Sequence, residues 1–163
     1  MTPRFGPVMQ LGFVVPDLER AMEHWTATVG VGPFFVMSHI KFVEAIYRGA
    51  PTDADISVAV AQWGEVQVEL IQQFNESPSI YSHFPGRAAG GLQHVGVMTN
   101  SVHDDLEKLR PHGIEAVQQG STANGIRFAS RTRRASTSRS TARRPTSRDR
   151  TRPIRSRRSC RSG

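Results

Sequence analysis

Two polar residues, Gln10 and His94, occupy the same place in two similar phrases of the sequence, and both types can donate to a metal ion. The phrase that begins at Val8 and the phrase that begins at Leu92 are weak copies of each other, 84 positions apart. The same offset aligns Gly12 with Gly96. A repeated strand and helix predict two similar modules packed into one domain. The matched polar residues then predict half of a metal site that the two modules share.

The first module begins with a short β-rich run from Val8 to Val15, which Pro16 stops. Asp17 is a good N-cap, and apolar residues at helical spacing predict an amphipathic helix over residues 18–29. Gly30 is placed to end that helix as a C-cap.

Extended chain follows from Phe34 to Met37, and strands are predicted at 42–48, 56–63 and 65–72. The module therefore has a β-α-β-β-β order. In its last strand, period-two alternation separates two sets of side chains. One face carries Glu65, Gln67, Glu69 and Ile71, and the other face carries Val66, Val68 and Leu70.

The second module follows a connecting loop over residues 75–91. It starts with a strand at 92–98, and Ser101 is the expected N-cap of a helix whose inward side chains are Val102, Leu106 and Leu109. Further strands are predicted at 115–118 and 126–129. The predicted fold class is α+β, with module one over residues 7–74 and module two over residues 91–130.

The charge of the chain changes abruptly after residue 130. Residues 1–130 carry 8 Lys and Arg against 13 Asp and Glu, whereas residues 131–163 carry 13 Arg against the single acid Asp149. The first part therefore gives no electrostatic case for nucleic acid. Residues 131–163 form a low-complexity Arg/Ser-rich tail, which is predicted to be disordered because it has almost no apolar side chains to bury.

Three interpretations of this tail remain open. It is a basic arm that binds RNA or acidic surfaces non-specifically, an ordinary disordered terminus, or the product of a wrong reading frame. Thirteen arginines without a lysine, and the abrupt loss of periodicity, favour the third interpretation.

The remaining composition indicates a cytoplasmic protein. Cys160 is the only cysteine, so no intrachain disulfide can form, which suits a reducing compartment. No apolar run is long enough for a signal sequence or a membrane span.

The phrase Gly12-Phe13-Val14-Val15-Pro16-Asp17-Leu18, the later Val68-Glu69-Leu70-Ile71 and the phrase His94-Val95-Gly96 occur in an order that resembles the vicinal oxygen chelate superfamily. This superfamily includes glyoxalase I, methylmalonyl-CoA epimerase, extradiol dioxygenases and bleomycin-binding proteins. The resemblance covers residues 7–130. It implies paired β-α-β-β-β modules that form a half-barrel around a cleft and one divalent ion.

The resemblance also implies which residues bind that ion. Gln10, Glu69 and His94 stand at the first three ligand positions, and their mixed nitrogen and oxygen donors suit Zn, Ni, Co, Mn or Fe. The fourth ligand should be a Glu on the last strand of module two. No Glu follows Glu115, and the strand itself is missing as a pattern, so the second module is incomplete and any metal is expected to bind weakly.

Each of the three residues also has a simpler interpretation. Gln10 is then a hydrogen-bonded strand residue, Glu69 a solvent-facing one and His94 a structural histidine. Only their matched placement on the repeat favours a shared site. The other histidines have no such positional support and receive no role: His24, His39, His83, His103 and His112.

The predicted function is a glyoxalase- or epimerase-like metal-dependent lyase or isomerase. It would act on a small α-carbonyl compound or thioester by proton transfer, with Glu69 as metal ligand and catalytic base. The alternatives are a metal-free binding protein of the bleomycin-resistance type and a defective enzyme that lacks its last strand. An incomplete module leaves an open sheet edge, which favours a homodimer.

Overall fold

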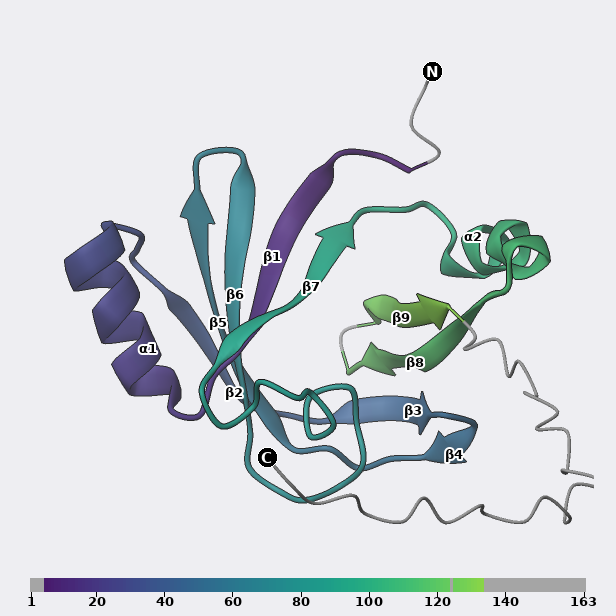
Figure 1. Cartoon of the computed structure of the whole chain (residues 1–163), viewed down its shortest axis with the longest axis horizontal. Coiled ribbons are helices and arrows are strands. Elements are labelled where there is room, and N and C mark those ends of the chain that lie inside the picture. Colours follow the sequence, from purple (N-terminus) through teal and green to yellow (C-terminus); the bar gives the residue numbers. More distant parts are fainter. Residues whose placement is uncertain (1–4, 124, 134–163) are drawn as a thin grey trace, which may run out of the picture.

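The computed structural model describes residues 5–123 and 125–133. Figure 1 shows two open sheets side by side, each with a helix packed on its outer side. The elements run in the order β1 (Val8–Val14), α1 (Leu18–His24), η1 (Trp25–Val29), β2 (Phe35–Ile40), β3 (Phe42–Tyr47), β4 (Ala50–Pro51), β5 (Ile56–Trp63), β6 (Val66–Gln73), β7 (Gly91–Val97), α2 (Val102–Leu109), η2 (Arg110–His112), β8 (Ile114–Thr122) and β9 (Arg127–Arg133).

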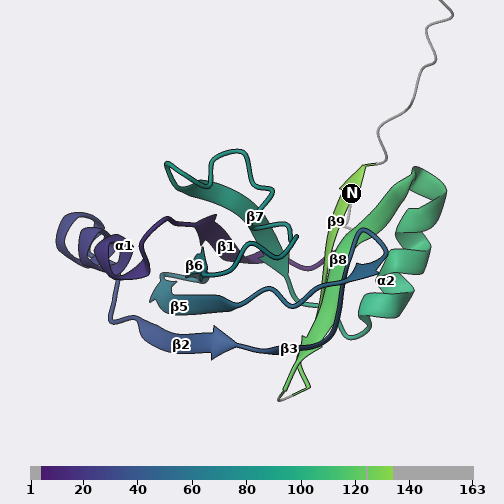
Figure 2. The same ribbon diagram turned by 90° about the horizontal axis from the view of Figure 1, so that it is seen from below.

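The larger sheet has five strands in the order β2-β5-β6-β1-β7, and the smaller has four in the order β4-β3-β8-β9. Helix α1 packs against β5 and β6, whereas α2 packs against β8 and β9. The view from below agrees, with the two helices at opposite ends of the molecule (Figure 2). The predicted α+β class is confirmed, and the sheets are open rather than closed into a barrel.

The first helix forms where the sequence predicts it. The Asp17 carboxylate accepts a hydrogen bond from the backbone N–H of Arg20 at 3.0 Å, which satisfies a donor of the first turn. The helix continues as a π-helical segment to Val29 and ends at Gly30, whose φ of 78° lies in the left-handed region that favours glycine. In the second module, Ser101 caps α2 in the same way, by accepting from the N–H of Asp104 at 3.2 Å.

Two buried clusters lie on opposite faces of the five-stranded sheet. The cluster beneath α1 includes Leu18 with Val68 and Leu70 of β6, and both β6 residues are 0% exposed. The cluster on the other face contains Val14, Ile71 and Tyr47, and it joins the two sheets through the loop residues Ile80 and Tyr81. The predicted alternation of β6 is thus confirmed, because Val68 and Leu70 face the helix and Ile71 faces away from it.

The chain crosses from one sheet to the other at Lys41, which the sequence pattern does not predict. Strand β2 pairs with β5 in the larger sheet, but β3 pairs with β8 of the second module in the smaller one. The predicted strand at 42–48 therefore forms, but outside the sheet of its own module. Such a pairing between distant segments leaves no local signal in the sequence.

The last described strand overlaps the start of the predicted tail. Strand β9 continues to Arg133, antiparallel to β8, and the rest of the predicted tail, 134–163, lies outside the described residues. Within residues 5–123 and 125–133, no helix is both long and apolar enough to cross a membrane.

Candidate metal centre

The central strand β1 places the candidate ligands side by side. Gly12 of β1 pairs with Glu69 of β6 on one side and with His94 of β7 on the other. Residues opposite one another in a sheet project to the same face. Because the neighbours of Glu69 in β6, Val68 and Leu70, lie beneath α1, Glu69 and His94 project from the opposite face, which that helix does not cover.

Glu69 and His94 meet across the boundary between the two modules. The Nε2 atom of His94 lies 3.4 Å from the Oε2 atom of Glu69, and the two side chains are 23% and 18% exposed. Both polar groups are thus largely removed from water yet still reachable from it. An imidazole nitrogen and a carboxylate oxygen that converge in this way can hold a cation or exchange a proton.

Gln10 lies on the same face, two residues before Gly12 along β1. Its Nε2 atom donates to the Oε1 atom of Gln67 at 2.8 Å. Gln67 is the register partner of Gln10 on β6, so the amide is held between β6 and β7 beside the Glu69–His94 contact. The hydrogen bond leaves the carbonyl oxygen of Gln10 as the atom that can turn to a cation.

Two glycines make room for these side chains. A Cβ atom at Gly12 would lie 2.0 Å from the Cε1 atom of His94, and a Cβ atom at Gly96 would lie 2.9 Å from the Cβ atom of Gln10. Each polar side chain therefore lies over the glycine of the opposite strand. The repeated pattern of a polar residue, an apolar residue and a glycine has a structural reason, because any larger side chain at either glycine would displace a candidate ligand.

A neighbouring amide orients the imidazole of His94. The Nδ1 atom of His94 lies 2.7 Å from the Oε1 atom of Gln93. When Nδ1 donates its hydrogen to this oxygen, the lone pair of Nε2 faces Glu69, which is the tautomer that a metal ligand needs.

Tyr81, from the connecting loop, completes the surroundings of Glu69. Its side chain belongs to the buried cluster that joins the two sheets. Burial raises the pKa of the Tyr81 phenol well above its usual range, and the negative charge of Glu69 raises it further. The phenol is therefore neutral at physiological pH, and it lies near enough to Glu69 for the charge of that carboxylate to act on it.

Gln67, Gln93 and Tyr81 are not among the site residues predicted from the sequence. Two of them could have been found from the sequence. Gln67 lies on the predicted face of Glu69, and Gln93 is the neighbour of His94 in the sequence. Tyr81 reaches the site from a long loop, whose course no periodicity predicts.

The donor set fits a divalent ion in part. Two ligands bound at about 2.1 Å with a tetrahedral angle lie about 3.4 Å apart, and the Glu69–His94 separation is 3.4 Å. Among the described residues, however, no group of three or more His, Cys, Asp and Glu side chains converges. Within this part of the chain the Gln10 amide is the third donor of the predicted set, and a neutral amide makes the site weaker than a further carboxylate would.

Two of the other histidines have partners of their own. His39 forms an ion pair with Asp55 at 2.9 Å between Nδ1 and Oδ1, and His83 stacks on Tyr47 with ring centroids 5.4 Å apart.

A family model describes proteins of this class, which have two such sheets, a repeated leading strand and site residues between the modules. The chain belongs to the Glyoxalase/Bleomycin resistance protein/Dioxygenase superfamily, whose model matches residues 9–130. This is the vicinal oxygen chelate superfamily that the sequence resembles. No curated protein matches the chain.

Solved structures share the fold at low sequence identity. A methylmalonyl-CoA epimerase from Mycobacterium tuberculosis is 18% identical with a TM-score of 0.54, over 80% of this chain and 83% of that one. A methylmalonyl-CoA epimerase in complex with methylmalonyl-CoA and NH4+ is 16% identical with a TM-score of 0.52, over 80% and 96%. A variant of 4-hydroxymandelate synthase from Streptomyces coelicolor is 16% identical with a TM-score of 0.51, over 76% of this chain but only 36% of that one.

Proposed function

We propose that the protein is a metal-dependent lyase or isomerase that moves a proton next to a carbonyl group of a small α-carbonyl compound or thioester. The contact between Glu69 and His94 carries this proposal, because it brings a carboxylate and an imidazole from two modules to 3.4 Å on the face that α1 leaves open. The proposed metal-binding residues are Gln10, Glu69 and His94.

Each residue has a defined part in this chemistry. A divalent ion held by Gln10, Glu69 and His94 would supply positive charge beside the oxygens of the substrate. Glu69 carries the carboxylate that accepts and returns the proton, His94 presents Nε2 in the tautomer that Gln93 sets, and Gln10 contributes its amide oxygen. Tyr81 stays protonated because of burial, so it can offer a hydrogen bond without competing as a base.

The relatives support the class of chemistry rather than a particular reaction. Two structural neighbours are methylmalonyl-CoA epimerases, one of them in complex with methylmalonyl-CoA, which is a thioester. At 16–18% identity they share the fold with this chain. The substrate class proposed here rests on the carboxylate–imidazole pair together with membership of the superfamily.

Two observations favour the metal-free alternative of the bleomycin-resistance type. The Gln10 amide is already hydrogen-bonded to Gln67, and Glu69 and His94 contact each other directly. In that case the open face sequesters a ligand without changing it. The third hypothesis, a defective enzyme, rests on the last strand that module two lacks within residues 91–123 and 125–133.

Proton exchange separates these functions. The full chain, with Zn²⁺, Ni²⁺ or Co²⁺ added in turn, is incubated in D₂O with a panel of 2-oxoaldehydes and acyl-CoA thioesters, and NMR records deuterium at the carbon next to the carbonyl. The proposal predicts exchange that Glu69→Gln abolishes and Glu65→Gln retains, since Glu65 lies in an exposed turn. Tight binding of a panel compound without exchange would favour the metal-free alternative. Exchange that survives Glu69→Gln would refute the role of Glu69.

The assembly and location form part of the proposal. We propose a homodimer in the cytoplasm, and the free edge strand β2 is a suitable contact because its apolar residues are exposed, with Phe35 at 72%. Light scattering on the wild-type chain and on Phe35→Lys tests the dimer. A Phe35→Lys variant that stays dimeric would exclude this edge.

A further inference from the structure

A cavity of about 400 Å³ lies between α1 and the segment that leads into β7. Phe13 of β1 and Trp25 of η1 line one side of it, and residues 89–91 line another side. Because Phe13 and Trp25 pack against the buried cluster beneath α1, the cavity is on the face of the larger sheet that this helix covers. The candidate metal centre lies on the opposite face, so the cavity is a separate place in the fold.

The two aromatic rings of the cavity are held in place by their neighbours. The centroids of Phe13 and Trp25 are 5.1 Å apart and the ring planes meet at 63°, which is an edge-to-face arrangement that aromatic pairs prefer. Trp63 of β5 contacts Trp25 in the same way, with centroids 5.9 Å apart. The aromatic wall is therefore preorganised, which lowers the entropic cost of binding a flat apolar group.

The wall that residues 89–91 form carries almost no side chains. Gly90 has a φ of 79°, in the left-handed region that favours glycine, and Gly91 follows it directly. Two successive residues thus present only their backbone to the cavity. A ring can approach such a wall closely, so the space between it and the aromatic side chains suits a flat ring system.

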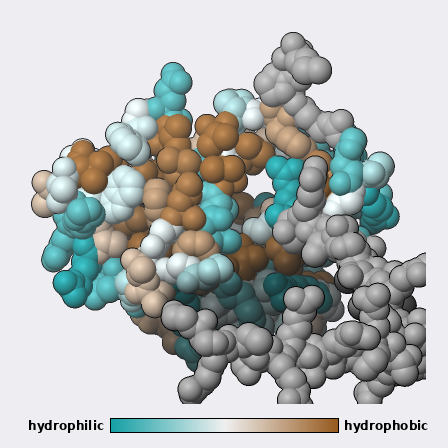
Figure 3. All heavy atoms as spheres, in the orientation of Figure 1, coloured by the Kyte–Doolittle hydropathy of each residue, from teal (hydrophilic) through white to brown (hydrophobic). Residues whose placement is uncertain are grey.

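Two basic side chains border the cavity on α1. Arg20 and His24 are one turn apart and exposed, and within residues 5–123 and 125–133 neither forms an ion pair. The Asp17 carboxylate, which also borders the cavity, accepts the backbone N–H of Arg20 as the helix cap. In the space-filling view hydrophobic residues gather over the strands beside α1, whereas the outer side of this helix is hydrophilic (Figure 3). An unpaired guanidinium next to an apolar cavity is complementary to an anionic group on an apolar body.

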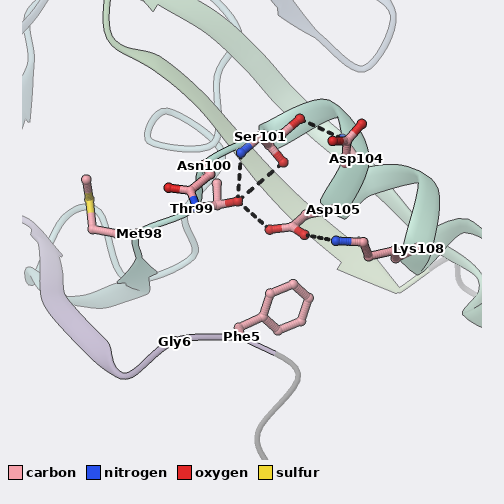
Figure 4. A pocket seen from close by; sticks show the side chains of 9 residues that line it. All are labelled: Phe5, Gly6, Met98, Thr99, Asn100, Ser101, Asp104, Asp105 and Lys108. Atoms are coloured by element: carbon pink, nitrogen blue, oxygen red, sulfur yellow. Dashed lines mark hydrogen bonds and ion pairs between the residues drawn. The ribbon is translucent and has the colours of Figure 1, made fainter.

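A second cavity, of about 390 Å³, does not combine these features. It lies between Phe5 and the first turns of α2 (Figure 4). Lys108 is the basic residue among those that line it, and its Nζ atom is already 3.0 Å from the Oδ1 atom of Asp105. The hydroxyl of Thr99 donates to the other oxygen of Asp105 at 2.6 Å. The charge of this lysine is therefore already paired, unlike that of Arg20.

We propose that the cavity beside α1 binds a small aromatic carboxylate. Its ring lies between the side chains of Phe13 and Trp25 and the backbone of residues 89–91, and its carboxylate pairs with the Arg20 guanidinium. His24, one turn further along α1, offers a further donor to the same carboxylate. The volume is near the lower end of the range of about 300–1,000 Å³ that small-molecule sites occupy, which suits a ligand of one or two rings. This inference does not depend on the proposed metal site.

The probe is 2-naphthoate, titrated into the ¹⁵N-labelled full chain with EDTA present. Saturable binding is expected with a Kd below about 1 mM. Amide shifts should cluster on residues 13–25 and 89–91, and the indole N–H signal of Trp25 should move with them.

A matched pair of variants tests the contact with Arg20. Arg20→Gln should weaken the binding of 2-naphthoate by about five- to tenfold. Arg110→Gln, at an exposed arginine outside the cavity, should leave the binding unchanged. Glutamine suits a position three residues after the helix cap, so the first variant should keep α1 folded.

A second probe, 2-naphthylmethylammonium, has the same ring system with a positive group. It should bind the wild-type chain at least about tenfold more weakly than 2-naphthoate, and Arg20→Glu should reverse this preference. Absence of saturable binding, equal affinity of the wild type for both probes, or shifts centred on Glu69 and His94 would each overturn the proposal. Because EDTA removes divalent ions and the cavity lies on the other face of the sheet, a failed metal site would leave the result unchanged.

Discussion

Modules one and two share a leading strand and helix, but the ends of the two leading strands differ in burial. Val14, the last residue of β1, is 2% exposed, whereas Met98, 84 positions later and directly after β7, is 72% exposed. The helices have equivalent caps and similar lengths, so local sequence does not cause the difference. The cause is β6, which covers α1 and fills the sheet beside β1. A repeat unit of this kind needs its last strand to bury the apolar surface of the others.

This difference extends to the candidate metal centre. One of its predicted ligands lies on a strand that is paired on both sides, and another lies on a strand that is paired on one side. Glu69 lies on β6, which is paired on both sides by β5 and β1. His94 lies on β7, which is paired on one side only within the described residues. Its ring is held by the space over Gly12 and by the contact with Gln93. We therefore infer that module one provides the rigid half of the site.

The largest expected effect compares the same substitution in the two modules. Leu70→Ala should lower the free energy of unfolding by about 3 kcal/mol, because it leaves a cavity where the side chain is 0% exposed. Leu92→Ala, in the same sheet, should change it by less than about 0.5 kcal/mol. Urea denaturation measures both. A large loss of stability in Leu92→Ala would mean that Leu92 is buried in solution. The difference in burial between the two modules would then be wrong.

Alanine at the glycine of β1 or of β7 should lower the free energy of unfolding by an intermediate amount. Gly12→Ala places a Cβ atom 2.0 Å from the His94 ring, so the ring must move, and the stability loss should be about 2 kcal/mol. Gly96→Ala meets Gln10 at 2.9 Å and should cost less. Denaturation and the ring NMR signals of His94 report these changes. Unchanged His94 signals in Gly12→Ala would show that the ring does not lie over this glycine.

The smallest effect concerns alkaline pH. Burial, with the charge of Glu69, raises the pKa of the Tyr81 phenol in the folded protein above its unfolded value near 10. The unfolded chain then loses this proton first, so the contribution to stability is complete below about pH 10 and is lost as the pH rises further. At pH 10.5 this loss of stability should be less than about 1 kcal/mol in the wild type, and the Tyr81→Phe variant should not show it. An identical pH profile for the variant and the wild type would place the phenol in water.

The sequence predicted the parts of the molecule that local patterns control. Asp17 and Gly30 marked the ends of the first helix, and the alternation around Glu69 assigned its face correctly. The repeat placed Gln10 and His94 on adjacent strands of one sheet. The pairing of β3 with β8 and the approach of Tyr81 to Glu69 join distant segments, and neither leaves a periodic signal. The contact of Gln10 with Gln67 depends on strand order, which an isolated strand pattern does not contain.

Calorimetric titration of the full chain with Zn²⁺ and Ni²⁺ tests most directly whether the two modules hold one ion between them. Weak, saturable binding is expected, since two strong donors and one neutral amide are present. Glu69→Gln should abolish the binding, Gln10→Ala should weaken it, and Glu65→Gln, in the exposed turn before β6, should leave it unchanged. Tight stoichiometric binding that survives Glu69→Gln would contradict the assignment and place the ion elsewhere.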